Sequence, residues 1–367
     1  FIICFHFSCT HAQTFDGSWK GEVEVSGQKL LLVFNIQKDS TGKWNGTFES
    51  PMQTAQKFAI TQIRIEHDSI WMDVRNIGLL YAGFLDRDKD VMKGVMKQGP
   101  FESAMILVRS ENEQSGLSRK QDVFPPYSYM EEEVSFRNSA GNAFLTGSLT
   151  YPKNGGSFPA VVLVNGSGQQ NRDSEVFGHR PFKVLADHLT KNGFAVLRYD
   201  DRGVGGSKGE VNLATTIDFA SDANAAVDFL SKKAVVDVDK IGMIGHSEGA
   251  LIAEIVASEN SKVSYIALLS GPVIKGDSLL ILQSYALGKA GGLSDAALQT
   301  NKANNRKLYT ILLKDEPPKA LAESLEKELI QQNNGNPLTP DMKIKLSPMM
   351  SPWFRTFLRI DPAYYLK

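Results

Sequence analysis

The N-terminal third of the chain contains short segments in which apolar and polar residues alternate. Successive side chains of a β-strand point to opposite faces, so a period of two predicts strands that are buried on one face. Gly, Asp, Asn and Ser separate the segments at hairpin spacing. We therefore predict an all-β domain over residues 13–110, an antiparallel meander that forms a small barrel or a sandwich. Its predicted strands lie at residues 17–21, 29–36, 44–48, 58–65, 69–74, 80–85, 91–96 and 104–108.

The hydrophobic pattern changes after this domain. Residues 111–130 are polar and contain Pro125-Pro126, which is typical of a linker. Two runs typical of a hairpin follow, and apolar strands then alternate with helical patterns. This alternation predicts a mainly parallel sheet covered by helices, so we predict an α/β domain over residues 131–367. Its predicted strands lie at residues 132–136, 144–151, 160–164, 195–199, 241–244 and 263–269.

Two helical regions of the α/β domain carry further information. Residues 215–218 form a capping-type start, and apolar residues follow at the +3 and +4 spacing of a buried helix face. Residues 277–350 are helical in pattern and more polar. A helical insertion at this point in the strand order is predicted to be a lid whose apolar face sets substrate preference. A plain helical layer on the sheet is the alternative.

Composition narrows the classes of function. The chain has 367 residues, a formal net charge of −1 and no Lys/Arg-rich run, which argues against capture of nucleic acid. Cys4 and Cys9 are its only cysteines, so the rest of the chain offers no disulfide, zinc–thiolate site or cysteine nucleophile. We predict no metal and no cofactor. No stretch beyond the first residues approaches the roughly 20 apolar residues of a membrane helix.

The first residues resemble a targeting segment. Residues 1–12 are apolar and then small and polar, without an initial Met or a basic start. This pattern favours the second half of a secretory signal peptide, with Thr10-His11-Ala12 as its cleavage site. A lipoprotein signal acylated at Cys9 and a buried first strand are the alternatives. The mature protein is therefore predicted to be exported to the periplasm or the exterior.

The sequence Gly245-His246-Ser247-Glu248-Gly249 stands between an apolar strand and an Ala-rich helix. This is the G-x-S-x-G pattern of a nucleophile elbow, in which a strained turn exposes the central Ser. Gly245 and Gly249 lack a Cβ and let the strand and the helix approach closely. Ser247 is the predicted nucleophile, beside a helix N-terminus that favours negative charge.

Two more Gly-rich turns follow predicted strands. Asn165-Gly166-Ser167-Gly168 can aim backbone N–H groups at a developing oxyanion. We predict an oxyanion hole formed by the N–H groups of Ser167 and Glu248. The other turn, residues 199–207, has neither a G-x-G-x-x-G pattern nor a phosphate-loop Lys, which argues against nucleotide binding. An Asp–Arg pair that braces this loop is the favoured interpretation.

The three motifs, in this order and with helices between them, resemble the α/β-hydrolase superfamily. More narrowly, the chain is similar to exported bacterial esterases and serine-aminopeptidase-like hydrolases that carry an N-terminal β domain. The resemblance covers residues 131–367 well and residues 14–110 more loosely. It implies a Ser-Asp-His triad in that chain order and hydrolysis of carboxylic esters or related acyl compounds without a cofactor.

The histidine positions do not complete this triad. The six histidines are His6, His11, His67, His179, His188 and His246. None follows Ser247, whereas the family places its Asp and His after a seventh and an eighth strand. We therefore expect a fragment whose triad Asp and His lie beyond Lys367, with residues 263–269 as an exposed sheet edge that promotes aggregation. His179 and His246 are candidate cleft-lining residues.

Three functions follow from these observations. The favoured one is a serine hydrolase that cleaves small-molecule acyl esters through an acyl-enzyme on Ser247. A serine peptidase or amidase of the same fold is the alternative among enzymes, because the same constellation cleaves amides. A catalytically inactive, ligand-binding homologue is the alternative outside them. A small-molecule substrate is the only partner predicted.

Overall fold

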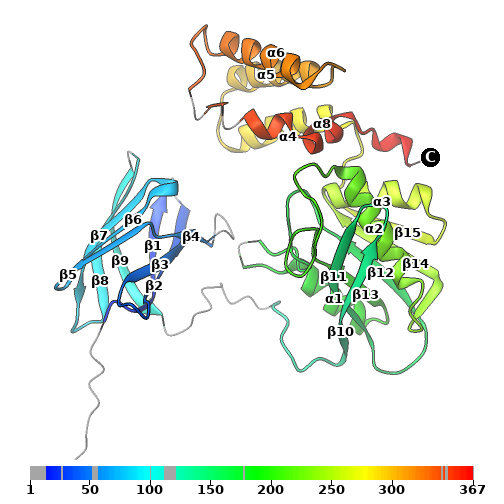
Figure 1. The fold of residues 1–367 in the computed structure, drawn as a ribbon, viewed down its shortest axis with the longest axis horizontal. Helices are drawn as coiled ribbons and strands as arrows, with labels where there is room; N and C mark the ends of the chain where they lie inside the picture. The colour runs from blue at the N-terminus through cyan, green and yellow to red at the C-terminus, as the bar shows by residue number, and fades with distance from the viewer. Residues whose placement is uncertain are drawn as a thin grey trace, which may run out of the picture. The chain divides into compact units, whose positions relative to one another are not determined.

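The computed structural model describes residues 14–25, 28–51, 57–99, 101–110, 121–176, 178–339, 342–343 and 346–366. The chain divides into two compact units (Figure 1), which we call the β unit and the α/β unit. The β unit comprises Phe1–Lys120 and Glu175–His179, and the α/β unit comprises Gln121–Ser174 and Arg180–Lys367. The predicted signal peptide and the first half of the predicted linker lie outside the described residues, so export stays a prediction.

The β unit contains one antiparallel sheet of nine strands in the order β4-β3-β2-β1-β9-β8-β7-β6-β5. Its strands are β1 (Gly17–Val25), β2 (Gln28–Lys38), β3 (Trp44–Glu49), β4 (Phe58–Ala59), β5 (Gln62–Glu66), β6 (Ser69–Val74), β7 (Leu79–Asp86), β8 (Val91–Gln98) and β9 (Phe101–Ser110), with a 3-10 turn (Arg75–Ile77) after β6. Alternate side chains of these strands form the interior. Trp19, Phe34, Tyr81 and Leu107, for example, are at most 1 % exposed.

The prediction of a single strand over residues 58–65 is wrong. This segment forms β4 at one edge of the sheet and β5 at the other. Between them, the Ile60 N–H donates to Gly46 O in β3 (2.9 Å) and the Thr61 N–H donates to Asp73 O in β6 (2.7 Å). Two adjacent residues thus link the two edges, so the sheet curls into a barrel-like form. A period-two pattern cannot reveal a strand that changes edge, because alternation continues through the bend.

The α/β unit contains a six-stranded sheet in the order β10-β11-β13-β12-β14-β15. Its strands are β10 (Tyr129–Asn138), β11 (Ala143–Pro152), β12 (Phe158–Val164), β13 (Ala195–Tyr199), β14 (Val236–His246) and β15 (Val263–Leu269). Strands β10 and β11 form the predicted hairpin, and β12 to β15 pair in parallel. The predicted mainly parallel sheet is therefore confirmed. Strand β15 forms one edge of the sheet, as predicted.

Helices cover both faces of this sheet, because alternate residues of its buried strands belong to two cores. Val162 and Val164 pack with α2 (Thr216–Leu230) and α3 (Glu248–Glu259), whereas Val161 and Leu163 pack with α1 (Pro181–Lys191). The predicted capping box at the start of α2 is confirmed: Asp218 accepts hydrogen bonds from the N–H and the hydroxyl of Thr215 (2.8 and 2.7 Å).

The predicted helical region lies within the α/β unit and extends past residue 350. It contains α4 (Gly276–Ala290), α5 (Asp295–Leu312), α6 (Pro318–Gln332) and α8 (Pro352–Arg359), with short 3-10 turns at Ser347–Met350 and Pro362–Tyr364. These helices have a core of their own, which includes Leu312, Leu325 and Leu358. Helix α8 also joins the core of the sheet through Phe357. None of the helices in the described ranges is long and apolar enough to cross a membrane.

Candidate active site

The turn that holds Ser247 is strained. Strand β14 ends at His246 and α3 begins at Glu248, which leaves Ser247 as the only residue of the turn. Its φ of 55° and ψ of −121° lie in a region that residues with side chains rarely adopt. The Ser247 N–H donates to Leu269 O (2.9 Å) and its carbonyl accepts from the Ala250 N–H (3.0 Å). These bonds hold the strained residue between the sheet edge and the helix.

Two glycines make the turn sterically feasible. A Cβ on Gly245 would collide with the backbone of Gly249, and a Cβ on Gly249 would collide with the carbonyl oxygens of Val164 and Asn165. The clashing atoms are backbone atoms, which cannot move aside as a flexible side chain can. The close approach of strand and helix that the sequence pattern predicts is therefore present in the structure, and it leaves no room for one additional carbon atom.

The loop after β12 lies against this elbow. A Cβ on Gly166 would be 3.2 Å from Ser247 Cβ and 3.3 Å from His246 Nδ1, so both residues border the loop. Ser167, the next residue, is exposed. Glu248 begins α3, and the first N–H groups of a helix have no partner within that helix. The predicted oxyanion donors, Ser167 and Glu248, thus belong to two backbone segments that meet at Ser247.

Asp201 braces the loop after β12. It accepts hydrogen bonds from Asn165 Nδ2 (3.1 Å) and from the Gln170 N–H (2.9 Å), and Asn165 Nδ2 also reaches Asn171 O (3.2 Å). Burial raises the pKa of Asp201 to about 7, and the hydrogen bonds from Gln170 and Asn165 oppose this rise. The carboxyl group of Asp201 therefore links the loop that carries Ser167 to the end of β13.

The predicted Asp–Arg brace of residues 199–207 exists, but its partners come from elsewhere in the chain. Arg202 pairs with Asp222 of α2 at 2.7 Å, and each side chain is 3 % exposed. Asp200 pairs with Arg172 at 2.7 Å. Adjacent Asp and Arg residues do not pair with each other here, because each points to a different neighbouring element. Sequence proximity indicated the type of interaction but not its partners.

The side chain of Glu248 points away from solvent and anchors the elbow. Glu248 is 2 % exposed, and its Oε1 accepts hydrogen bonds from Thr216 Oγ1 and Trp353 Nε1, both at 2.7 Å. Trp353 lies in α8, so the helical layer is bonded directly to the residue that follows Ser247. The sequence predicted neither of these two hydrogen bonds to Glu248. A Trp beside apolar residues in a helix is expected to be a core residue. Its hydrogen-bond acceptor lies more than 100 positions earlier in the chain, so no local sequence pattern predicts the bond.

The histidines fall in different places. His246 is exposed at the end of β14, where its ring borders Gly166. His179 pairs through its backbone with Val176 and groups with the β unit, so its place in the cleft stays a prediction. His188 lies in α1, near its C-terminal end. Among the side-chain hydrogen bonds of the described residues, none joins Ser247 to a histidine.

Comparisons with known proteins agree with this geometry. Residues 177–333 match the family model described as serine aminopeptidase, S33. The chain is 31 % identical over 199 residues to esterase EstD of Thermotoga maritima, which covers 50 % of this chain and 46 % of that protein. It is 37 % identical over 100 residues to an uncharacterised protein of Mycobacterium tuberculosis, covering 27 % of this chain and 31 % of the relative. The chain thus spans less than half the length of these relatives.

A solved structure of an esterase from Pyrococcus furiosus is also similar, with 24 % identity, a TM-score of 0.37, and coverage of 44 % of this chain and 59 % of that one. The family match contains the elbow, the preceding helix and most of the helical layer. The strained Ser247 and the glycines on each side of it lie within the matched residues. The α/β unit thus has an α/β-hydrolase fold, preceded in the chain by a barrel-like β domain, and the chain is similar to serine aminopeptidases of the S33 family and to esterases.

Proposed function

We propose that the protein is a serine hydrolase that cleaves carboxylic esters through an acyl-enzyme on Ser247. The observation that carries the proposal is the strained backbone of Ser247, held between β14 and α3 by glycines that admit no Cβ. Strain at a residue with a side chain costs roughly 1–3 kcal/mol and is characteristic of functional sites. An elbow of this form presents a hydroxyl at the tip of a turn, beside backbone donors.

In the proposed reaction, Ser247 Oγ attacks the acyl carbonyl carbon while a general base takes the hydroxyl proton. The carbonyl oxygen becomes an oxyanion, which the N–H groups of Ser167 and Glu248 stabilise. The intermediate then collapses, the alcohol leaves with the proton returned by the base, and an acyl-enzyme remains. Water repeats the sequence and releases the acid. The Asp201 brace and the anchoring of Glu248 keep the two donor segments in register during these steps.

The general base is the part of the mechanism that the described histidines do not supply. We propose that the triad Asp and His follow Lys367, as in the family order. A Ser hydroxyl without a base is a poor nucleophile, and removal of the triad His costs about 10⁶ in turnover in subtilisin. The 367-residue chain should therefore react very slowly, whereas a product extended by the codons that follow Lys367 should react at an ordinary rate.

A fluorophosphonate probe tests this proposal on both products. The extended product should be labelled at Ser247, as located by peptide mass spectrometry, and should hydrolyse 4-nitrophenyl acetate. Ser247→Ala should abolish both activities. Ser270→Ala is a matched control, because Ser270 follows the neighbouring strand and also has a positive φ, 53°. Failure of the extended product to be labelled would favour the inactive, ligand-binding homologue.

A serine peptidase or amidase is the second candidate, and the match to the serine aminopeptidase model favours it. The same nucleophile and oxyanion donors can cleave an amide if the leaving amine is protonated. Paired substrates with one acyl group separate the two functions. We expect the extended product to cleave an alanine 4-nitrophenyl ester far faster, relative to the spontaneous rates, than alanine 4-nitroanilide. A preference for the anilide would identify an aminopeptidase.

A further inference from the structure

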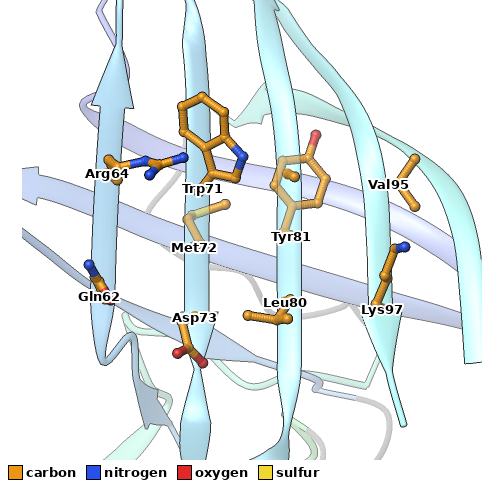
Figure 2. Close-up of a pocket in the computed structure, with 10 residues that line it drawn as sticks. Gln62, Arg64, Trp71, Met72, Asp73, Leu80, Tyr81, Val95 and Lys97 are labelled. Atoms are coloured by element: carbon orange, nitrogen blue, oxygen red, sulfur yellow. The ribbon is translucent and has the colours of Figure 1, made fainter. Parts of the chain in front are cut away.

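A pocket of about 400 Å³ lies on the β unit, in the other compact unit from Ser247 (Figure 2). It lies across four adjacent strands, β5, β6, β7 and β8, on the face of the sheet opposite the packed interior. Ten residues line it. Two of them, Met72 and Tyr81, belong to the buried interior, and the other eight form two rows of paired residues, with one residue from each strand in each row. One row is Gln62, Asp73, Leu80 and Lys97, and the other is Arg64, Trp71, Ala82 and Val95. The strand register thus brings eight side chains to one site.

The indole ring of Trp71 forms a fixed wall of this pocket. Arg64 of β5 stacks on the ring, with its guanidinium carbon 4.2 Å from the ring centroid, and Figure 2 shows it pointing toward Trp71. This contact covers the face of the indole that looks toward β5 and limits its rotation. The neighbour on the other side is Ala82, which lines the pocket and has only a methyl group with which to cover the second face. An apolar, planar surface therefore borders a floor of Ala82 and Val95.

The charged groups around the pocket compensate one another. Arg64 pairs with Glu66 at 3.6 Å, Arg75 pairs with Asp73 at 3.4 Å, and Lys97 pairs with Glu102 at 3.0 Å. Each of the charged lining residues Arg64, Asp73 and Lys97 is thus paired with an opposite charge beside the pocket, which leaves little net charge with which to select an ionic ligand. Each group still has free hydrogen-bonding capacity, since a guanidinium has five donor hydrogens and a carboxylate accepts about four bonds. Gln62 adds both a donor and an acceptor.

From these features we propose that the pocket binds a neutral carbohydrate, with a sugar ring stacked on the free face of Trp71. A pyranose has an apolar face of C–H groups and a rim of hydroxyls that both donate and accept hydrogen bonds. The pocket offers the complement of each: an apolar wall and floor, and a mixed rim of donors and acceptors. A fatty acyl chain would leave the hydrogen-bonding groups of the rim unpaired, and an organic anion would find each cation already paired with a carboxylate. The open position on a sheet face suits a segment of an oligosaccharide.

Isothermal titration calorimetry of the full chain tests this proposal with unsubstituted hexasaccharides of β-linked glucose, β-linked xylose, β-linked N-acetylglucosamine and α-linked mannose. At least one should bind with a Kd of about 10 µM to 1 mM, as expected for a shallow open site. Trp71→Ala should weaken that binding by at least about tenfold, because the stacking surface is lost. Ala82→Leu should weaken the binding similarly, because the larger side chain fills the space beside the Trp71 ring. The loss would occur even though the variant adds apolar surface at an exposed position.

Phe84→Ala is the matched control, because Phe84 is a 50 % exposed aromatic residue of β7 on the same sheet face and outside the pocket. It should change the affinity by less than about twofold. The proposal is overturned if no hexasaccharide binds at millimolar concentration, or if Ala82→Leu leaves the affinity unchanged in a chain whose circular dichroism is normal. Binding of decanoate or 4-hydroxycinnamate in place of the sugars would likewise overturn it. None of these outcomes depends on Ser247.

Discussion

The elbow at Ser247 and the pocket at Trp71 are built by opposite means. At the elbow the backbone determines the geometry: the positive φ of Ser247 and the two flanking glycines fix the position of the Ser247 hydroxyl. At the pocket the backbone is an ordinary sheet, and cross-strand register brings side chains together. The charges differ as well. The α/β unit buries Glu248, Arg202 and Asp222, whereas the pairs around the pocket are half-exposed or exposed.

This difference indicates how each site tolerates change. A site defined by close backbone contacts fails when one atom is added, since the interior is packed without spare volume. A site defined by exposed side chains loses its ligand when a side chain changes, but the fold persists, because surface substitutions alter stability by about 0.5 kcal/mol or less. The variants below test this contrast at paired positions.

The largest effect is expected from Gly249→Ala. The added Cβ collides with the Val164 and Asn165 carbonyls, so strand and helix must separate and Ser247 must move. Fluorophosphonate labelling of the extended product should fall by at least about 100-fold, the scale of losing an oxyanion donor. Ala82→Val adds two carbons to the small residue of the pocket and should leave both labelling and stability unchanged. Equal effects of the two variants would contradict the contrast.

Two ion pairs of nearly equal length differ strongly in burial. Arg202–Asp222 measures 2.7 Å with both side chains 3 % exposed, and Arg87–Asp68 measures 2.6 Å with side chains 50 and 53 % exposed. Asp222→Asn leaves Arg202 buried without a counter-charge and should cost about 3–5 kcal/mol of unfolding free energy. Asp68→Asn should cost less than about 1 kcal/mol. Urea denaturation with hydrogen exchange of α2 peptides would assign each loss to its unit.

Glu254 gives the α/β unit a pH dependence with a defined sign. This residue of α3 is 1 % exposed, both its carboxyl oxygens lack a hydrogen-bond partner, and burial raises its pKa to about 7 from 4.5. Between these values the folded chain binds a proton that the unfolded chain has lost. The free energy of unfolding should therefore fall as the pH rises from about 4.5 to 7, and stay constant above that.

Glu254→Gln isolates this contribution. The variant should be more stable than the parent by roughly 2–3 kcal/mol at pH 8 and about equal to it at pH 4.5. Part of the pH dependence should remain, because Asp201 has a raised pKa in the same window. Glu102→Gln, at an exposed pair in the β unit, is the control that should change nothing. A constant difference between Glu254→Gln and the parent across this pH range would refute the assignment.

How well the sequence predicted each feature depends on how far apart in the chain the residues that determine it lie. The elbow was predictable because its glycines, serine and flanking periodicity lie within about ten residues, and sterics alone dictate the turn. The capping box was predictable for the same reason. The split of residues 58–65 into two edge strands was not, because alternation alone does not record a change of sheet edge.

The long-range contacts escaped prediction. The pocket depends on the register of four strands, and a shift of one residue in β6 or β7 would move Trp71 or Leu80 to the interior. The partners of Arg202 and Asp200 depend on which element packs against their loop.

The smallest effect is expected where the helical layer meets the elbow. Trp353→Phe removes the hydrogen bond from Nε1 to Glu248 but keeps an aromatic ring to stack on Phe357, 5.8 Å away. A bond of this type contributes roughly 1–2 kcal/mol, and Thr216 still holds the carboxyl group. Since the Glu248 N–H is a proposed oxyanion donor, labelling of the extended product should slow only a few-fold.

Thr216→Val should have an effect of similar size. The double variant should lose more than the sum of the two, because Glu248 then has neither anchor. Strict additivity, with labelling unchanged throughout, would mean that the helical layer packs on the elbow without positioning it.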